Sequence, residues 1–128
     1  MAKKFSIKRD PTFTTTVNLP APGQAPVPVS FTFKWMDRKS VALFQDDWFK
    51  FWEENKDVAI EEKWNNKKWA EVREPFEFDK LKSIISSWEI EEEFNDENLM
   101  ALVQSSNELA AIIVRGYLDA YEKAREGN

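Results

Sequence analysis

Apolar residues alternate with polar ones in two stretches near the start of the chain. The first stretch runs from Thr12 to Leu19, where threonines separate the apolar side chains, and the second runs from Val27 to Trp35. A period of two is typical of a half-buried β-strand. The prolines and the glycine of residues 20–26 cannot maintain a hydrogen-bonded ladder, so we predict an antiparallel hairpin with a protruding loop there. Because an isolated hairpin is marginal in water, its apolar face must rest on the helices that follow or on a partner's strand.

The spacing changes from strand-like to helical at Asp37. Its side chain is suited to an N-cap, and the residues on either side of it, Met36 and Val41, are spaced as a hydrophobic staple. The apolar positions that follow lie at offsets of three, four, three and one, and so share one side of a helical wheel. They are Val41, Phe44, Trp48, Phe51 and Trp52. We therefore predict a helix that begins at Asp37 and carries a heavy aromatic stripe.

The middle of the chain gives a more scattered pattern. We predict a second helix over residues 57–72, which Pro75 ends because proline removes a backbone donor. Asp79 then has the side chain of a cap, and we predict a short helix from there through Trp88.

Two capping signals mark the last third of the chain. Asn95 precedes an apolar pattern and predicts a short helix to Gln104. Ser105 and Glu108 have the spacing of a capping box, which predicts a final helix running toward Gly127.

The final helix carries Gly116 near its middle. A glycine in a helix interior costs roughly 1 kcal/mol relative to alanine, so we expect another backbone to pack closely there. Together the elements predict an α+β fold, an N-terminal antiparallel β-hairpin followed by a predominantly α-helical bundle. We expect a single domain over residues 1–128, with an arm and the hairpin in residues 1–36 and the helical part in residues 37–128.

The chain lacks two residue types on which much enzyme and metal chemistry depends. It has no cysteine and no histidine, so it offers no disulfide, thiolate nucleophile, imidazole base, or sulfur- or imidazole-ligated metal. Three glycines cannot build a phosphate-cradling loop. The acidic run over residues 89–97 lacks the spacing of a calcium loop, which leaves an enzyme with carboxylate chemistry as the weakest hypothesis. We predict a non-catalytic protein with no cofactor and no metal.

Charge and hydropathy bear on partners and location. The net charge of −5 divides into +4 over residues 1–50 and −9 over residues 51–128. The acidic half repels phosphate backbones, so we expect no nucleic-acid partner. The start of the chain does not read as a secretory signal, and no run of about 18 apolar residues occurs. We therefore expect no membrane partner and a cytoplasmic location.

Aromatic residues are unusually abundant, with six tryptophans and ten phenylalanines. One interpretation is that the stripe after Asp37 fills the core, and the other is that part of this surface binds a partner. Trp64 and Trp69 are the stronger interface candidates, because three lysines surround them. The full set of candidate partner-binding residues is Trp48, Phe51, Trp52, Trp64, Trp69, Tyr117 and Tyr121.

The two ends of the chain resemble a known family, the tail assembly chaperones of tailed bacteriophages and prophages. At the C-terminal end the resemblance rests on residues 87–100, which read SWEIEEEFNDENLM, on residues 109–117, and on the ending REGN at 125–128. At the N-terminal end it rests on residues 13–23, with the loop sequence PAPG, and on residues 31–38, which read FTFKWMDR. These parts are similar to the family's opening hairpin, its entry into the first helix and its closing helices.

The resemblance implies a protein that binds the helical tape-measure protein while the tail tube polymerises around it. It implies that the chaperone acts in the host bacterial cytoplasm and leaves before the virion is complete. The resemblance would also imply the major tail tube protein as a further partner. Whether the chain forms a homo-oligomer is left open. The alternative is a generic adaptor without catalytic activity, whose hairpin edges pair between subunits.

Overall fold

The N-terminal hairpin and a short strand from later in the chain form a three-stranded antiparallel sheet. The computed structural model describes residues 4–7 and 11–126. Strands β1 (Thr12–Ala21) and β2 (Gln24–Lys34) form the predicted hairpin, in a register that pairs Val17 with Val29. A short strand, β3 (Ile85–Trp88), adds to the other side of β2 over Phe31–Phe33, and the sheet order is β1-β2-β3. The α+β class and the N-terminal hairpin are therefore confirmed.

The predicted protruding loop at residues 20–26 is wrong. Ala21 pairs with Gln24, so the connection is a two-residue turn, and Gly23 adopts a φ of 74°. Proline followed by a residue of positive φ is typical of a type II turn. The prolines on β2 come before the segment that pairs with β3. The part of β2 that contains them is therefore a sheet edge, where a missing N–H need not break a ladder.

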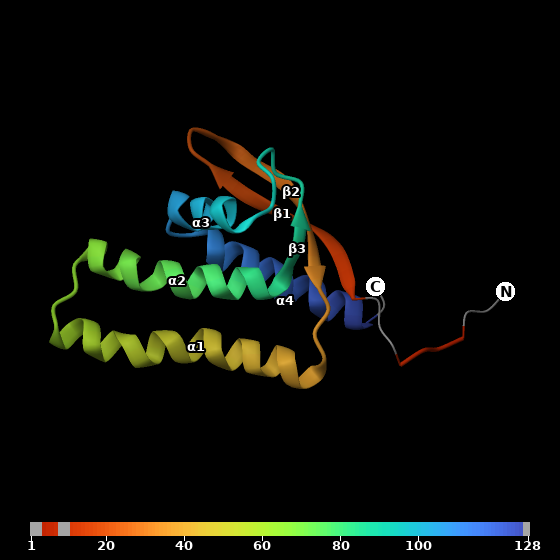
Figure 1. The fold of residues 1–128 in the computed structure, drawn as a ribbon, viewed down its shortest axis with the longest axis horizontal. Coiled ribbons are helices and arrows are strands. Elements are labelled where there is room, and N and C mark those ends of the chain that lie inside the picture. The colour runs from red at the N-terminus through yellow and green to blue at the C-terminus, as the bar shows by residue number, and fades with distance from the viewer. Residues whose placement is uncertain (1–3, 8–10, 127–128) are drawn as a thin grey trace.

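Two long antiparallel helices follow the hairpin and form one side of the molecule (Figure 1). The first, α1 (Arg38–Glu61), begins at the predicted cap, where the Asp37 carboxylate accepts a hydrogen bond from the Ser40 amide at 2.8 Å. The second, α2 (Asn66–Ile84), begins after a short turn and runs back beside α1. The aromatic stripe of α1 faces α2, and Phe44 and Trp48 are buried.

The predicted boundaries in the middle of the chain are wrong. Residues 57–72 belong to two helices with a turn between them, and Pro75 lies inside α2 instead of ending a helix. Asp79 lies within α2 and caps no separate helix, and the predicted end near Trp88 is strand β3. Aromatic packing explains why α2 continues through the proline: Phe76 stacks on Phe51 with ring centroids 4.0 Å apart. Tertiary contacts override local propensity here.

The chain closes with α3 (Asp96–Ser105) and α4 (Leu109–Glu126). The cap at Asn95 is confirmed, since its side chain accepts a hydrogen bond from the Asn98 amide at 2.8 Å. The predicted capping box at Ser105 is wrong, because that hydroxyl donates to the Leu102 carbonyl while Ser106 accepts from the Glu108 amide. The Ser106 hydroxyl therefore bonds an amide two residues on, just before α4 begins at Leu109.

One hydrophobic core joins all of these elements, and α4 packs against the sheet. Its completely buried large side chains are Tyr117, Phe31, Phe33, Leu81, Ile84, Ile85, Leu99 and Ile113. Gly116 lies where α4 meets β1, and the group that approaches it is the side chain of Val17, not a backbone as predicted. The helix α1 lies at the outer edge of the fold and packs mainly on α2 (Figure 1).

Candidate functional site

Three tryptophans come together near the free end of the α1–α2 hairpin. Trp52 of α1 stacks on Trp69 of α2 with ring centroids 6.1 Å apart and an interplanar angle of 30°. Trp64, from the connecting turn, meets Trp69 edge-to-face at 5.1 Å. All three side chains are half-buried, so part of each indole faces solvent. We call the surface around Trp52, Trp64 and Trp69 the tryptophan groove.

The turn between the helices fixes the position of Trp64. Lys63 has a φ of 55°, a left-handed conformation that reverses the chain within a few residues. The Asn65 side chain then caps α2 by accepting a hydrogen bond from the Lys68 amide at 2.9 Å. The Trp64 indole donates to the Glu62 carboxylate at 3.3 Å. The indole is therefore held by its polar edge while its ring packs on Trp69.

An open cavity of about 590 Å³ lies beside the stacked indoles. Its lining residues come from α1, α2 and the α3–α4 connection: Trp52, Lys56, Asn66, Trp69, Ala70, Arg73 and Asn107. The Arg73 guanidinium lies 5.5 Å from the Trp52 ring, and the Lys68 ammonium lies 5.7 Å from the Trp64 ring. Cations in this geometry are attracted to the indole faces and form a polar rim.

Arg73 stands between this cavity and a smaller one of about 270 Å³ that reaches toward α3. The guanidinium pairs with Glu77 at 3.0 Å and donates to the Asn107 carbonyl. Glu77 is only 3% exposed. Burial raises the pKa of its carboxyl group above the ordinary value, while the charge of Arg73 acts in the opposite direction. The pair ties the floor of the groove to the α3–α4 connection.

The other sequence candidates occupy different environments. Trp48 is buried, and Phe51 is half-buried; both pack on Phe76. Tyr117 and Tyr121 lie in the core under the sheet, and their hydroxyls donate to the carbonyls of residues 34 and 36. The structure thus brings three of the seven candidates together at an open surface.

A comparison with known families matches the whole chain. The model of the phage tail assembly chaperone family covers residues 1–128. The chain belongs to this family. No curated protein and no solved structure matches it.

The groove of this tail assembly chaperone includes residues that the sequence analysis missed. Lys56 and Arg73 each follow a groove tryptophan by four positions, which places them on the same helix face. That spacing is a local signal that could have found them. Asn107 enters from the α3–α4 connection, and only the tertiary structure brings it to the groove.

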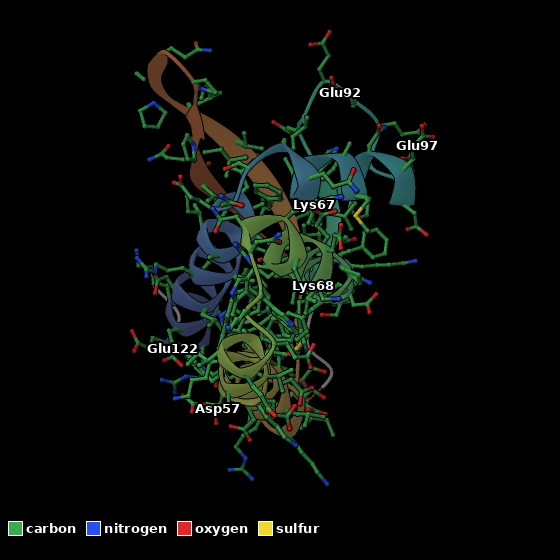
Figure 2. All side chains as sticks on the ribbon, turned by 90° about the vertical axis from the view of Figure 1, so that its left-hand side faces the viewer. Asp57, Lys67, Lys68, Glu92, Glu97 and Glu122 are labelled. Carbon is green, nitrogen blue, oxygen red and sulfur yellow. The ribbon has the colours of Figure 1, made fainter. Side chains whose placement is uncertain are left out.

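The acidic segment of the tail assembly chaperone forms no comparable site. Figure 2 shows Glu92 and Glu97 pointing away from the body of the protein, and both are exposed. Within residues 4–7 and 11–126, no three acidic side chains converge so as to hold a metal ion. Among the helices of residues 11–126, none has the length and apolar character that a bilayer crossing requires.

Proposed function

We propose that the tryptophan groove binds an apolar face of the tape-measure protein during tail tube assembly. The observation that carries this proposal is the position of Trp52 and Trp69, which line an open cavity while the core is filled by other side chains, with Trp64 packed against Trp69. Large aromatic side chains that remain partly exposed in a concave surface are typical anchors of protein interfaces.

A helical client fits the shape and chemistry of the groove. An amphipathic helix presents apolar anchors at positions i, i+3, i+4 and i+7, which can enter a groove between two helices. Tryptophan loses little conformational entropy on binding, because it has only two side-chain torsions. The charged side chains of Lys56 and Arg73 border the same cavity, and polar groups at a rim orient a partner more than they add affinity.

Release is part of the same proposal. The chaperone must leave before the virion is complete, so a small groove with a charged rim suits it better than an extensive apolar interface. In this role the protein acts in the host cytoplasm, uses no cofactor and performs no catalysis. The polymerising major tail tube protein would displace it by covering the same apolar face of the client.

Co-expression with a tape-measure segment tests the proposal. The wild-type chain should keep the segment soluble. A variant with Trp64→Ala and Trp69→Ala should lose most of that effect, because two of the three half-buried rings of the groove are removed. Purified wild type should also show a change in tryptophan emission on adding the segment, and the double variant should show a smaller one.

A matched control separates loss of binding from loss of folding. Trp35 also packs on an aromatic ring, Tyr121, with centroids 4.4 Å apart, but it lies on the loop between β2 and α1 instead of in the groove. Trp35→Ala should therefore keep the segment soluble, provided that circular dichroism and thermal melting show a folded chain. If the groove variant is folded and solubilises as well as wild type, the client does not bind here.

A further inference from the structure

The side of α1 next to the groove carries an exposed stripe that no other part of residues 4–7 and 11–126 covers. Phe49 is 63% exposed and Ile60 is 76% exposed. Between them lie Glu53 and Lys56, whose side chains are 71% and 55% exposed and form an ion pair at 3.0 Å. Single exposed apolar side chains are common on protein surfaces, and what distinguishes Phe49 and Ile60 is that they share one face of α1 with an ion pair between them.

The spacing of these four residues is that of a coiled-coil seam. The steps from Phe49 to Glu53, Lys56 and Ile60 are four, three and four residues. At about 100° per residue these positions fall within roughly 60° of one another, and they extend over about 16.5 Å of helix. In heptad terms they are d, a, d and a positions. Helices with apolar residues at such positions pack along their length against one another; here Phe49 and Ile60 supply the apolar positions, and Glu53 and Lys56 are charged.

We propose that two copies of this chain pair through their α1 helices in an antiparallel arrangement. In that register Phe49 lies against Ile60 of the second copy, and Glu53 lies against Lys56 of the second copy. Two-fold symmetry repeats each contact, so the seam has apolar ends and opposite charges at its centre. A parallel pair would instead place Glu53 against Glu53 and Lys56 against Lys56, and like charges across a seam disfavour that orientation.

The seam is short, and this sets the strength of the pairing. Stable dimers usually bury at least about 1,200 Å² in total, which two helices touching over four positions do not reach. The dimer is therefore a weak, reversible species whose population depends on concentration. Lys56 also lines the tryptophan groove, so the pairing surface borders the groove. The inference does not depend on the client proposed above.

Sedimentation velocity over a concentration series tests the pairing with the isolated full-length chain. Wild type should shift from monomer to dimer as its concentration rises toward the millimolar range. Glu53→Lys places two lysine pairs across the seam and should raise the dimer dissociation constant at least about tenfold. The double variant Glu53→Lys, Lys56→Glu restores opposite charges and should dimerise like wild type. A wild-type chain that stays monomeric, or a double variant that behaves like Glu53→Lys, overturns the proposal.

An apolar control lies on the same helix. Leu43 is 60% exposed but lies on a different side of α1, so Leu43→Ser should leave the association unchanged while Ile60→Ser should weaken it. Equal effects of the two substitutions would mean that general surface stickiness, and not this seam, causes any association.

Disulfide cross-linking tests the orientation of the two helices. Because the chain has no native cysteine, only the introduced thiols can form a disulfide. Phe49→Cys and Ile60→Cys are prepared separately, one of them carrying a tag that changes its mass. On mild oxidation the mixture should form mainly the mixed dimer, because the antiparallel register brings residue 49 to residue 60 of the second copy. Mainly like-with-like dimers would show a parallel pair and overturn the arrangement.

Discussion

The side chain of Val17 on β1 fills the space that a side chain at Gly116 on α4 would occupy. An ideal Cβ at Gly116 would lie 2.7 Å from Cγ2 of Val17 and 3.3 Å from Cγ1. Val17 is buried and branched at Cβ, so it has few other rotamers to adopt. The glycine therefore lets the last helix lie close against the sheet.

Gly116→Ala should destabilise the protein, although alanine is the better helix former. The helix propensity gained is about 1 kcal/mol, whereas overpacking a filled core typically costs about 1–3 kcal/mol. We expect a net loss of about 1 kcal/mol in the free energy of unfolding, measured by urea denaturation.

A double-mutant cycle identifies the cause of that loss. Val17→Ala removes the atoms that a Cβ at residue 116 would meet, so Gly116→Ala should be neutral or stabilising in that background. If Gly116→Ala raises stability in the wild-type chain, the contact with Val17 does not constrain this position.

Local signals in the sequence were enough to predict the ends of the fold. The alternation in β1 and β2 and the caps at Asp37 and Asn95 act through the nearest residues, and the structure confirms them. Pro75 misled the prediction because the contacts that sustain α2 join residues far apart in sequence, such as Phe76 with Phe51. Strand β3 forms by pairing with β2, which no local pattern in residues 85–88 reveals.

The candidate site was predictable to a similar degree. The lysines around Trp64 and Trp69 indicated half-exposed indoles, and both rings lie in the groove. The sequence did not reveal the turn that connects α1 to α2. One continuous helix was predicted over residues 57–72, so Asn65 was not recognised as a cap. The pairing of Arg73 with Glu77 is a local contact four residues apart on α2, whereas its bond to the Asn107 carbonyl follows from tertiary packing.

Asn65→Ala should loosen the start of α2 and with it the groove. The Asn65 side chain satisfies the Lys68 amide, and loss of an N-cap typically costs about 1 kcal/mol of stability. Urea denaturation should show this loss, while Asn66→Ala, one position further along, should change stability much less because Asn66 is not the cap. Equal losses in the two variants would contradict the capping role.

Tyr117→Phe and Tyr121→Phe should each reduce stability without reducing client binding. Their hydroxyls donate to the Lys34 carbonyl at 3.0 Å and the Met36 carbonyl at 2.7 Å. A tyrosine hydroxyl is a protonated donor at neutral pH even at its ordinary pKa, and burial raises the pKa of Tyr117 further. Loss of such a bond typically costs about 1 kcal/mol. Client solubilisation that falls in either folded variant would place that tyrosine in the binding surface.

Glu77 should make the stability of the protein fall as pH rises through weakly acidic values. Burial raises the pKa of its carboxyl group in the folded chain above the ordinary 4.5, and the charge of Arg73 offsets this only in part. Between the unfolded and the folded pKa, the folded chain therefore binds more protons than the unfolded chain. In that window the free energy of unfolding decreases with increasing pH, and above the folded pKa this contribution is fully lost.

Glu77→Gln removes this titration and should remove the slope that it causes. Glutamine also changes the hydrogen bonds to Arg73, but that effect does not vary with the titration of residue 77, so only the pH dependence of the difference is diagnostic. Urea denaturation of both chains from pH 4 to pH 7 should show wild type losing stability relative to the variant as pH rises above about 4.5. A difference that stays constant over this range would mean that the Glu77 carboxyl titrates as it does in the unfolded chain, and that Arg73 fully offsets its burial.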